Sequence, residues 1–260
     1  MIGQKNLFDR LNNYDINTLP KSNLLIGEYG CGKHSFIKCV CDKFNLEYSD
    51  ITNELSNEFI LDLYSNTQLK LYVIDINELS KKHRYINKEN SILKFVEEPP
   101  LNAYVFILCE YDSQIIDTIK NRCIIWQFSQ YTIDELKTFK SFDNIKVYSL
   151  LNTPGKILSS KDEIFYSNLF NLCDTIILKI NRANVSNTLS LDRHLEIYTI
   201  DLFFNALKQV VYDECCKTYT NSLFLKYDLI NKYIEKSHCL GVSLKLLFDN
   251  FLLELKLIND

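Results

Sequence analysis

The sequence predicts an α/β fold in its first half, a parallel sheet built around a glycine-rich loop, followed by an all-helical second half. Three observations predict it. A glycine-rich turn joins a short apolar strand to a helix, and apolar strands then alternate with helical segments over about 125 residues. Beyond these strands the apolar residues recur with helical periodicity alone.

The glycine-rich turn has the spacing of a phosphate loop. An apolar strand at Leu24 to Ile26 is followed by Gly27, Gly30, Gly32 and Lys33, and then by a helical pattern. The whole chain has 6 glycines, so three in one short turn indicate a backbone that bends tightly and points its N–H groups inward. Such a turn, with a lysine at the start of a helix, binds the phosphates of a nucleotide. A turn that only packs is the alternative.

The metal position of this loop departs from the usual pattern. That pattern is G-x-x-x-x-G-K-[ST], and the chain has G-E-Y-G-C-G-K-H. His34 stands where a hydroxyl would hold Mg²⁺, and Ser35 follows one position later, about 100° further round the helix. We include both residues in the expected site for ATP or ADP with Mg²⁺.

A second part of that site is expected at Asp75. The apolar run from Leu71 to Ile76 is typical of a strand buried on both faces of a parallel sheet. A carboxylate at the C-terminal end of such a strand lies beside the phosphate loop, where it can hold the water shell of Mg²⁺. We therefore assign Asp75 to the nucleotide and to the metal.

The remaining elements are expected from periodicity and capping residues. Strands are expected at 46–48, 103–109 and 124–128, and helices at 2–14, 33–44, 53–63, 87–98, 112–121 and 132–139. Asn53 and Thr132 are the expected caps of two of these helices. Long helices are expected at 161–181, 194–216, 222–238 and 243–258. The last is apolar nearly all round, which predicts deep burial or burial by a partner.

Composition excludes several classes of protein. The net charge of −4 means that the surface as a whole does not hold nucleic acid by charge alone. The 9 cysteines are scattered without C-x-x-C spacing, which indicates reduced thiols and no zinc site. No apolar run has the length of a membrane span, and residues 1–10 lack the apolar core of a signal peptide. We expect a cytoplasmic protein, in the host cytoplasm if the source is viral.

Four stretches of the chain resemble one family. Ile2-Gly3-Gln4 resembles the I-G-Q box, and N-S-I-L-K-F-V-E-E-P-P, at 90–100, resembles an N-A-L-L-K-x-L-E-E-P-P segment. Asn121-Arg122-Cys123 resembles an S-R-C motif, and residues 152–156 resemble the S-P-G-[KR] turn of a helical lid. The order and spacing are similar to those of AAA+ sliding-clamp loader subunits, nearest to the delta-prime subunit of bacterial DNA polymerase III.

This resemblance implies both an architecture and a role. It implies an AAA+ nucleotide-binding domain at 1–129, a small helical lid at 130–160 and an all-α collar at 161–260 that joins subunits in a hetero-pentameric ring. The implied partners are the other loader subunits, the sliding clamp and, through the complex, primed DNA, with no membrane. Such a loader opens the clamp, places it on DNA and releases it when ATP is hydrolysed.

The chain departs from the family where hydrolysis is concerned. Ile76 replaces the glutamate that polarises the attacking water, and a positioned general base is worth about 10² to 10⁴ in rate. His34 replaces the metal hydroxyl. Gly155 lies where active loaders place a lid arginine, with Lys156 one residue later. We expect at most feeble ATPase activity from this chain alone.

Arg122 is the expected catalytic residue, acting on a neighbouring subunit. A guanidinium at a subunit boundary can stabilise charge on the phosphoryl group being transferred next door, an effect of about 10³ to 10⁵ in rate. The alternative is an ordinary surface arginine at a helix end. The basic run Lys81 to Arg84 and Lys94 are weaker candidates for contacts with DNA phosphate, and Glu97 and Glu98 for structural hydrogen bonds.

Two other functions stay open from the sequence. One is a working clamp-loader ATPase in which His34 and other groups replace the missing parts. The other is an unrelated phosphate-loop kinase or signalling ATPase, which the E-E-P-P segment disfavours.

Overall fold

The computed structural model describes residues 2–81, 85–179, 199–237 and 244–259. The chain forms two compact units, one of residues 1–140 with 152–159, the other of residues 141–151 with 160–260. The division into domains at 129 and 160 stays a prediction. No described helix is long and apolar enough to cross a membrane.

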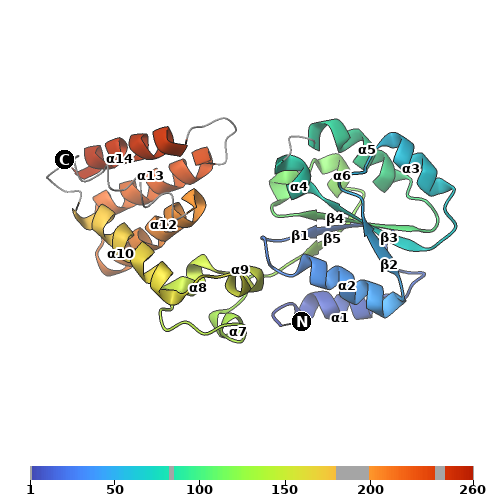
Figure 1. The fold of residues 1–260 in the computed structure, drawn as a ribbon, viewed down its shortest axis with the longest axis horizontal. Coiled ribbons are helices and arrows are strands. Elements are labelled where there is room, and N and C mark those ends of the chain that lie inside the picture. The colour runs from blue at the N-terminus through green and yellow to red at the C-terminus, as the bar shows by residue number, and fades with distance from the viewer. Residues whose placement is uncertain (1, 82–84, 180–198, 238–243, 260) are drawn as a thin grey trace. The chain divides into compact units, whose positions relative to one another are not determined.

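The first unit is a parallel sheet covered by helices on both faces (Figure 1). The strand order is β2-β3-β4-β1-β5, and the strands are β1 Ser22–Ile26, β2 Glu47–Asp50, β3 Lys70–Asp75, β4 Ala103–Cys109 and β5 Ile124–Gln127. One face carries α1 Lys5–Asn12 and α2 Lys33–Phe44. The other carries α3 Asn57–Tyr64, α4 Ile76–Lys81, α5 Tyr85–Glu97 and α6 Asp117–Lys120. The α/β fold predicted from strand and helix alternation is confirmed.

Strand alternation divides the interior of this unit into two cores. Successive side chains of a strand point to opposite faces of the sheet. Leu24 and Ile26 of β1 therefore join the core beneath α3 and α5, while Leu25 joins Phe36 and Trp126 on the α2 side. All five residues are buried, so each face of the sheet anchors the helices that position the loop.

The register of the central strands brings their C-terminal ends to one edge. Ile26 is paired with Cys109, and Asp75 is paired with Leu108. Because the strands are parallel, the segments that follow β1, β3 and β4 emerge side by side. This edge is where the glycine loop and Asp75 meet.

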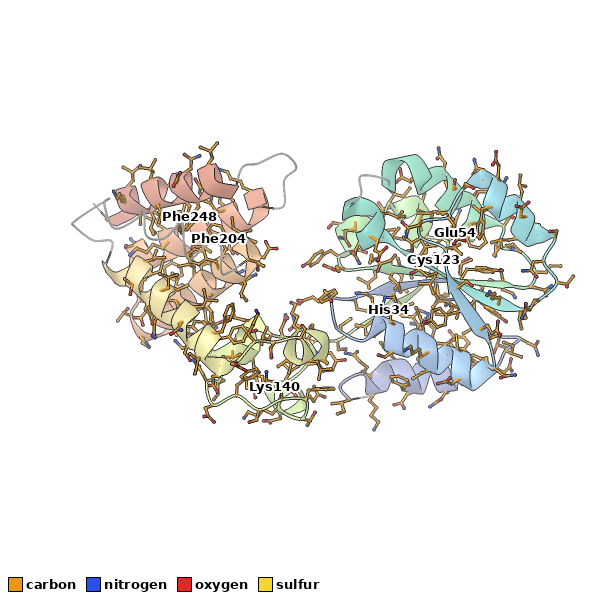
Figure 2. The ribbon with its side chains drawn as sticks, viewed as in Figure 1. His34, Glu54, Cys123, Lys140, Phe204 and Phe248 are labelled. Carbon is orange, nitrogen blue, oxygen red and sulfur yellow. The ribbon has the colours of Figure 1, made fainter. Side chains whose placement is uncertain are left out.

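The second unit is a helical bundle. Its helices are α8 Lys146–Leu150, α10 Glu163–Lys179, α12 Ile200–Lys217, α13 Asn221–Ser237 and α14 Leu244–Asn259. Helix α12 packs against α8, α10 and α13, and α13 packs against α14. Phe204 lies in the bundle core (Figure 2), with ring centroids 5.1 Å from Phe251, 5.9 Å from Phe203 and 6.3 Å from Tyr233. The predicted helical second half is confirmed for α10, α12, α13 and α14, while residues 180–198 and 238–243 of the predicted helices and their connections lie outside the described residues.

Two predicted helices are wrong in detail. Helix α3 begins at Asn57 rather than Asn53, because Ile51 and Leu55 are both buried in a turn that precedes it and Ser56 is the N-cap. The helix expected at 112–121 is split into a 3₁₀ turn at 112–114 and α6. Extended Ile115 and Ile116 separate the two, and burial of the Ile115 side chain accounts for the break.

Candidate nucleotide site and surface arginine

The phosphate loop has the backbone that its glycines predict. Gly27 follows β1 directly, and its N–H donates a hydrogen bond to the Cys109 carbonyl at 3.2 Å. Gly30 and Gly32 have φ of 78° and 104°, in the left-handed region that favours glycine. Helix α2 begins at Lys33 immediately after Gly32, so its first-turn amides, which lack partners within the helix, lie at the loop.

Close packing beneath the loop fixes its first glycine. A Cβ on Gly27 would lie 2.7 Å from Phe128 Cβ and 2.8 Å from Cys31 Sγ. Real Cβ atoms do not come this close to other atoms, so a side chain here would displace the loop. Cys31 is itself buried, and burial raises the pKa of its thiol.

Every main-chain carbonyl from Gly27 to Cys31 accepts a hydrogen bond. The donors are Lys33 Nζ to the Gly27 and Glu28 oxygens, Thr153 Oγ1 to Tyr29, the Gly155 N–H to Gly30 and Tyr131 Oη to Cys31. The loop is thus held by contacts from its own lysine and from two segments more than 90 residues away, since Tyr131 and Cys31 are separated by 100 positions. Glu28, Tyr131 and Thr153 were not singled out as site residues by the sequence analysis.

The residues predicted around the lysine lie at the start of α2. Lys33 is 7% exposed, with its ammonium turned into the loop. His34 and Ser35 follow on the exposed first turn of α2 (Figure 2). The group at the hydroxyl position is therefore an exposed imidazole.

Asp75 ends β3 with its backbone and side chain both engaged. Its N–H donates to Thr52 Oγ1 at 2.9 Å, and its Oδ1 accepts from the Asn77 N–H at 2.9 Å. Thr52 is fully buried. Asn77 Oδ1 is the one buried side-chain oxygen or nitrogen without a hydrogen-bond partner in the part of the chain that the structure describes. Neither Thr52 nor Asn77 was predicted, although each is a polar residue placed just after a strand.

Ile76 follows Asp75 directly but packs in the apolar core. It is the first residue of α4, one position beyond the strand that was expected to include it. Its side chain is 0% exposed and belongs to the core beneath α3 and α5. The position directly after the strand-end aspartate therefore faces apolar packing and offers no group that accepts a proton.

The Cys109 thiol shows which charges surround the strand ends. Burial raises its pKa to about 12, and the smaller charge effects on it come from Lys33, Asp112, Lys120 and Asp75. Lys33 and Asp75 thus both act on one buried sulfur. That the loop lysine and the strand-end carboxylate form one site stays a prediction.

These residues fit the phosphates of a nucleotide better than they fit a metal ion. The glycine loop, the first turn of α2 and Lys33 supply the donors and the positive charge that phosphate needs. Asp75 supplies one carboxylate. Among the described residues there is no group of three or more His, Cys, Asp or Glu side chains arranged to hold a metal, so Mg²⁺ at this site would depend on the nucleotide for further ligands.

Arg122 lies at the surface just after α6. Its side chain is 41% exposed, and its Nη2 forms an ion pair with Glu97 Oε1 at 2.7 Å. Its Nη1 donates to the Thr118 carbonyl at 2.7 Å. The next residue, Cys123, is buried, and burial raises the pKa of its thiol to about 12. The buried cysteine anchors the segment while the guanidinium faces outward.

The weaker candidates are only partly visible. Residues 82–84 of the basic run, and the side chain of Lys81, lie outside the described residues. Lys94 is exposed on α5. Glu97 forms the ion pair described above, and the Glu98 carbonyl accepts a hydrogen bond from Tyr64 Oη.

Comparison with known proteins identifies relatives in DNA replication. Residues 42–132 match the model of a family described as DNA polymerase III, delta subunit. The DNA polymerase III subunit delta' of Buchnera aphidicola subsp. Baizongia pistaciae is 31% identical over an alignment of 104 residues that covers 36% of this chain. The match spans 31% of that relative's length.

Two solved structures are similar to the chain. A DNA polymerase III gamma subunit-related protein of Thermotoga maritima is 12% identical, with a TM-score of 0.50 over 99% of this chain and 100% of that one. A RuvB mutant of Thermotoga maritima is 15% identical, with a TM-score of 0.47 over 96% of this chain and 82% of that one. The first similarity shows the fold. By its matched segment the chain resembles the delta-prime subunit of bacterial DNA polymerase III, as its motifs predicted, and by its architecture it has the α/β phosphate-loop fold of the gamma subunit-related protein.

Proposed function

We propose that this chain is a delta-prime-like subunit of a clamp loader, which helps to load a sliding clamp onto primed DNA. The observation that carries the proposal is the combination at one sheet edge of a phosphate loop that keeps its glycines and lysine and an apolar residue, Ile76, at the position of the catalytic acid. A chain that keeps the cradle and lacks the acid fits a ring member that binds nucleotide and turns it over slowly or not at all.

Weak hydrolysis by this chain follows from its own residues. The loop and Lys33 would hold the phosphates of ATP or ADP, and Asp75 would hold the water shell of Mg²⁺, which neutralises phosphate charge when bound. Ile76 is buried among apolar side chains and accepts no proton. Loss of a general base lowers the rate by about 10² to 10⁴, and His34 adds to that loss by replacing the metal hydroxyl.

Arg122 would act as an arginine finger toward a neighbouring subunit. Its guanidinium is partly exposed, and its ion pair with Glu97, itself 40% exposed, is of the kind worth about 0 to 1 kcal/mol. Exchange of the Glu97 carboxylate for a phosphate of the neighbour's nucleotide therefore costs little. The gain at the neighbour would be about 10³ to 10⁵ in rate.

The helical bundle would supply contacts within the ring. Leu246, Leu253 and Leu257 of α14 are 62%, 59% and 76% exposed. Their spacing of seven and four residues places them within about 40° of one another on one side of the helix. The opposite side, with Phe248 and Phe251, is buried in the bundle. We assign the exposed leucine side to other loader subunits, in the cytoplasm of the cell or of a host.

Reconstitution with the other subunits tests this proposal. We expect the chain to co-purify with the polymerase clamp and the remaining loader subunits. Arg122→Ala should leave assembly intact and lower ATP turnover at the neighbouring site by about 10³-fold or more. Lys120→Ala, which removes a nearby lysine paired with Asp112 and Asp117, is the matched control and should leave turnover unchanged.

Two results would separate the parts of the proposal. Unchanged turnover in an assembled Arg122→Ala complex would remove the finger role alone. Failure to associate with any loader subunit would remove membership of the loader.

An active ATPase is the second candidate function, favoured by the glycine turn of the loop and its buried lysine. Single-turnover hydrolysis by the isolated chain, with and without Mg²⁺, distinguishes the two. A rate comparable with that of an active loader subunit would favour the ATPase.

A further inference from the structure

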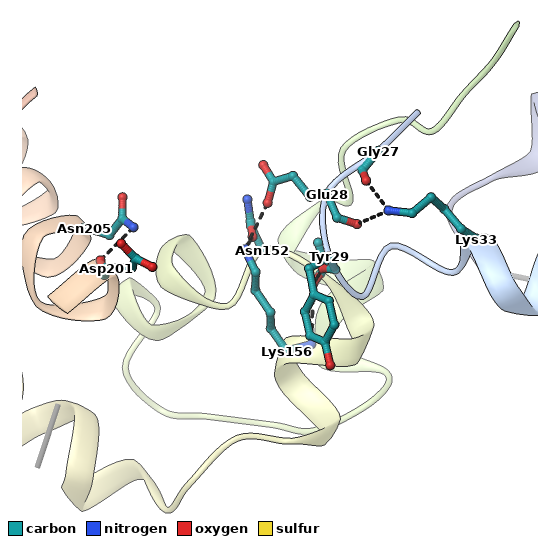
Figure 3. A network of polar contacts seen from close by, with 9 residues as sticks. Gly27, Glu28, Tyr29, Lys33, Asn152, Lys156, Asp201 and Asn205 are labelled. Carbon is teal, nitrogen blue, oxygen red and sulfur yellow. Dashed lines mark hydrogen bonds and ion pairs between the residues drawn. The ribbon is translucent and has the colours of Figure 1, made fainter. Parts of the chain in front are cut away.

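Both lysines of the loop region are already paired with oxygen atoms of the loop. Lys33 Nζ donates to the Gly27 and Glu28 carbonyls. Lys156 Nζ forms an ion pair with Glu28 Oε2 at 3.0 Å and donates to Asn152 Oδ1 at 2.8 Å (Figure 3). Glu28 therefore engages one lysine through its main chain and the other through its carboxylate.

Lys156 is held at the loop by the turn that carries it. Thr153 caps the short helix α9, Pro154–Leu158, and its Oγ1 also donates to the Tyr29 carbonyl at 2.8 Å. The Gly155 N–H donates to the Gly30 carbonyl at 2.9 Å. A Cβ on Gly155 would lie 2.5 Å from Gly30 Cα, so the two backbones are in direct contact.

This contact fixes what Lys156 can reach. The ammonium is on the residue directly after Gly155, and its two acceptors are Glu28 of the loop and Asn152 of the same turn. With the Glu28 carboxylate removed, Asn152 and the turn would still hold the ammonium beside the loop. An anion bound in the loop would then be its strongest available partner.

We propose that Glu28 is the residue that sets the affinity of this loop for nucleoside diphosphates and triphosphates, because its carboxylate occupies Lys156 in place of a phosphate. The proposal rests on the nucleotide-binding role proposed above for the loop. The carboxylate opposes a bound phosphate in two ways. It adds a like charge to the loop, and it keeps a cation that phosphate would otherwise use.

The test is a double-mutant cycle read out by ADP binding. Isothermal titration calorimetry of the full chain with ADP, at low ionic strength, compares wild type, Glu28→Gln, Lys156→Ala and the double variant. We expect Glu28→Gln to bind ADP about two- to fivefold more tightly, the range of a partly exposed charge pair. The gain should be clearly smaller in the double variant, because the part that depends on the released lysine is lost while the part due to the like charge remains.

Controls separate this charge effect from changes in folding and from contacts with the base. Glu54→Gln removes an exposed carboxylate elsewhere in the same unit (Figure 2) and should leave ADP affinity unchanged. Inorganic pyrophosphate should show the same preference for Glu28→Gln as ADP. Fluorescence of Trp126, the single tryptophan, verifies that the unit is folded in each variant.

The outcomes are decisive in both directions. ADP affinity of Glu28→Gln no higher than that of wild type would overturn the proposal, and so would a gain of undiminished size in the double variant. A gain that needs Lys156, found in a chain that fails to join a clamp loader, would support this inference while removing the proposed function.

Discussion

Substitution of Gly155 by alanine tests the contact between the 152–159 turn and the loop. Gly155 is the second residue of α9, where helix propensity alone favours alanine by up to about 1 kcal/mol. The structure predicts instead that alanine at this position lowers the stability of the folded chain. The new Cβ would lie 2.5, 3.1 and 3.3 Å from Gly30 Cα, O and C, all of them backbone atoms that cannot rotate away.

The magnitude follows from what the turn would lose by moving. Withdrawal from Gly30 breaks the hydrogen bond from the Gly155 N–H and the one from Thr153 to the Tyr29 carbonyl, each worth about 0.5 to 1.5 kcal/mol. If the turn stays, overpacking costs a similar amount, about 1 to 3 kcal/mol. After the gain in propensity, we expect Gly155→Ala to lower the free energy of unfolding by about 1 to 2 kcal/mol.

Urea unfolding followed by tryptophan fluorescence measures this change in the first unit. Trp126 is 0% exposed, and its Nε1 donates to Asn23 Oδ1 at 2.9 Å, so its emission reports on the sheet that carries the loop. Leu158→Ala, at a 67% exposed position of the same helix, is the control, and its effect should stay within about 0.5 kcal/mol. A Gly155→Ala variant as stable as wild type, or more stable, would refute the reasoning.

Three further changes test other parts of the molecule. Phe204→Ala should lower the free energy of unfolding of the helical bundle by about 3 to 5 kcal/mol, measured by far-UV circular dichroism, because a fully buried ring is lost. Burial, and next the hydrogen bond to Glu254, raise the pKa of Tyr233 to about 12. Because this folded pKa lies above the unfolded value near 10, the neutral Tyr233 hydroxyl stabilises the folded bundle fully below pH 10, and this stabilisation is lost as pH rises toward 12. Tyr233→Phe should therefore flatten the loss of stability at alkaline pH. Exposed Cys216 should react with a thiol reagent at pH 8 while buried Cys109, whose pKa burial raises to about 12, does not, as read by peptide mass spectrometry.

Each of these three predictions has a result that would contradict it. If Phe204→Ala lowers the free energy of unfolding no more than Phe224→Ala, at a 46% exposed position, tight packing around Phe204 is excluded. An alkaline stability curve for Tyr233→Phe that coincides with that of Tyr219→Phe, at an 87% exposed tyrosine, would exclude the raised pKa. Modification of Cys109 as fast as Cys216 in the folded chain would mean that the end of β4 is open to solvent.

Local sequence was sufficient to predict the loop and the sheet. Gly30, Gly32 and Lys33 lie next to one another in sequence, and their conformation depends on neighbouring residues, so the pattern predicted both the turn and the start of α2. The run from Ala103 to Cys109 is apolar throughout, and it forms β4 with the predicted bounds. Such elements are specified within a few residues.

The contacts that complete the site could not be predicted in this way. The ion pair between Glu28 and Lys156 joins residues 128 positions apart, and no local pattern specifies it. Asn53 was a plausible cap, but burial of Leu55 moved the start of the helix to the next capping residue, Ser56. In both cases tertiary packing decided between locally acceptable alternatives.

The main-chain carbonyls of the loop already accept hydrogen bonds, and this restricts the kind of ligand that the loop can bind. From Gly27 to Cys31 the main-chain oxygens are already in use as acceptors within the chain. The groups of the loop that remain for an anion are the first-turn N–H groups of α2 and the Lys33 ammonium, beside the Glu28 carboxylate that Lys156 already pairs with. A ligand that donates hydrogen bonds, such as an amine or an alcohol, finds the main-chain oxygens of the loop already engaged. An oxyanion instead accepts hydrogen bonds from the N–H groups, which have the complementary polarity. The hydrogen bonds that the loop carbonyls accept within the chain thus contribute to the preference of this site for anions.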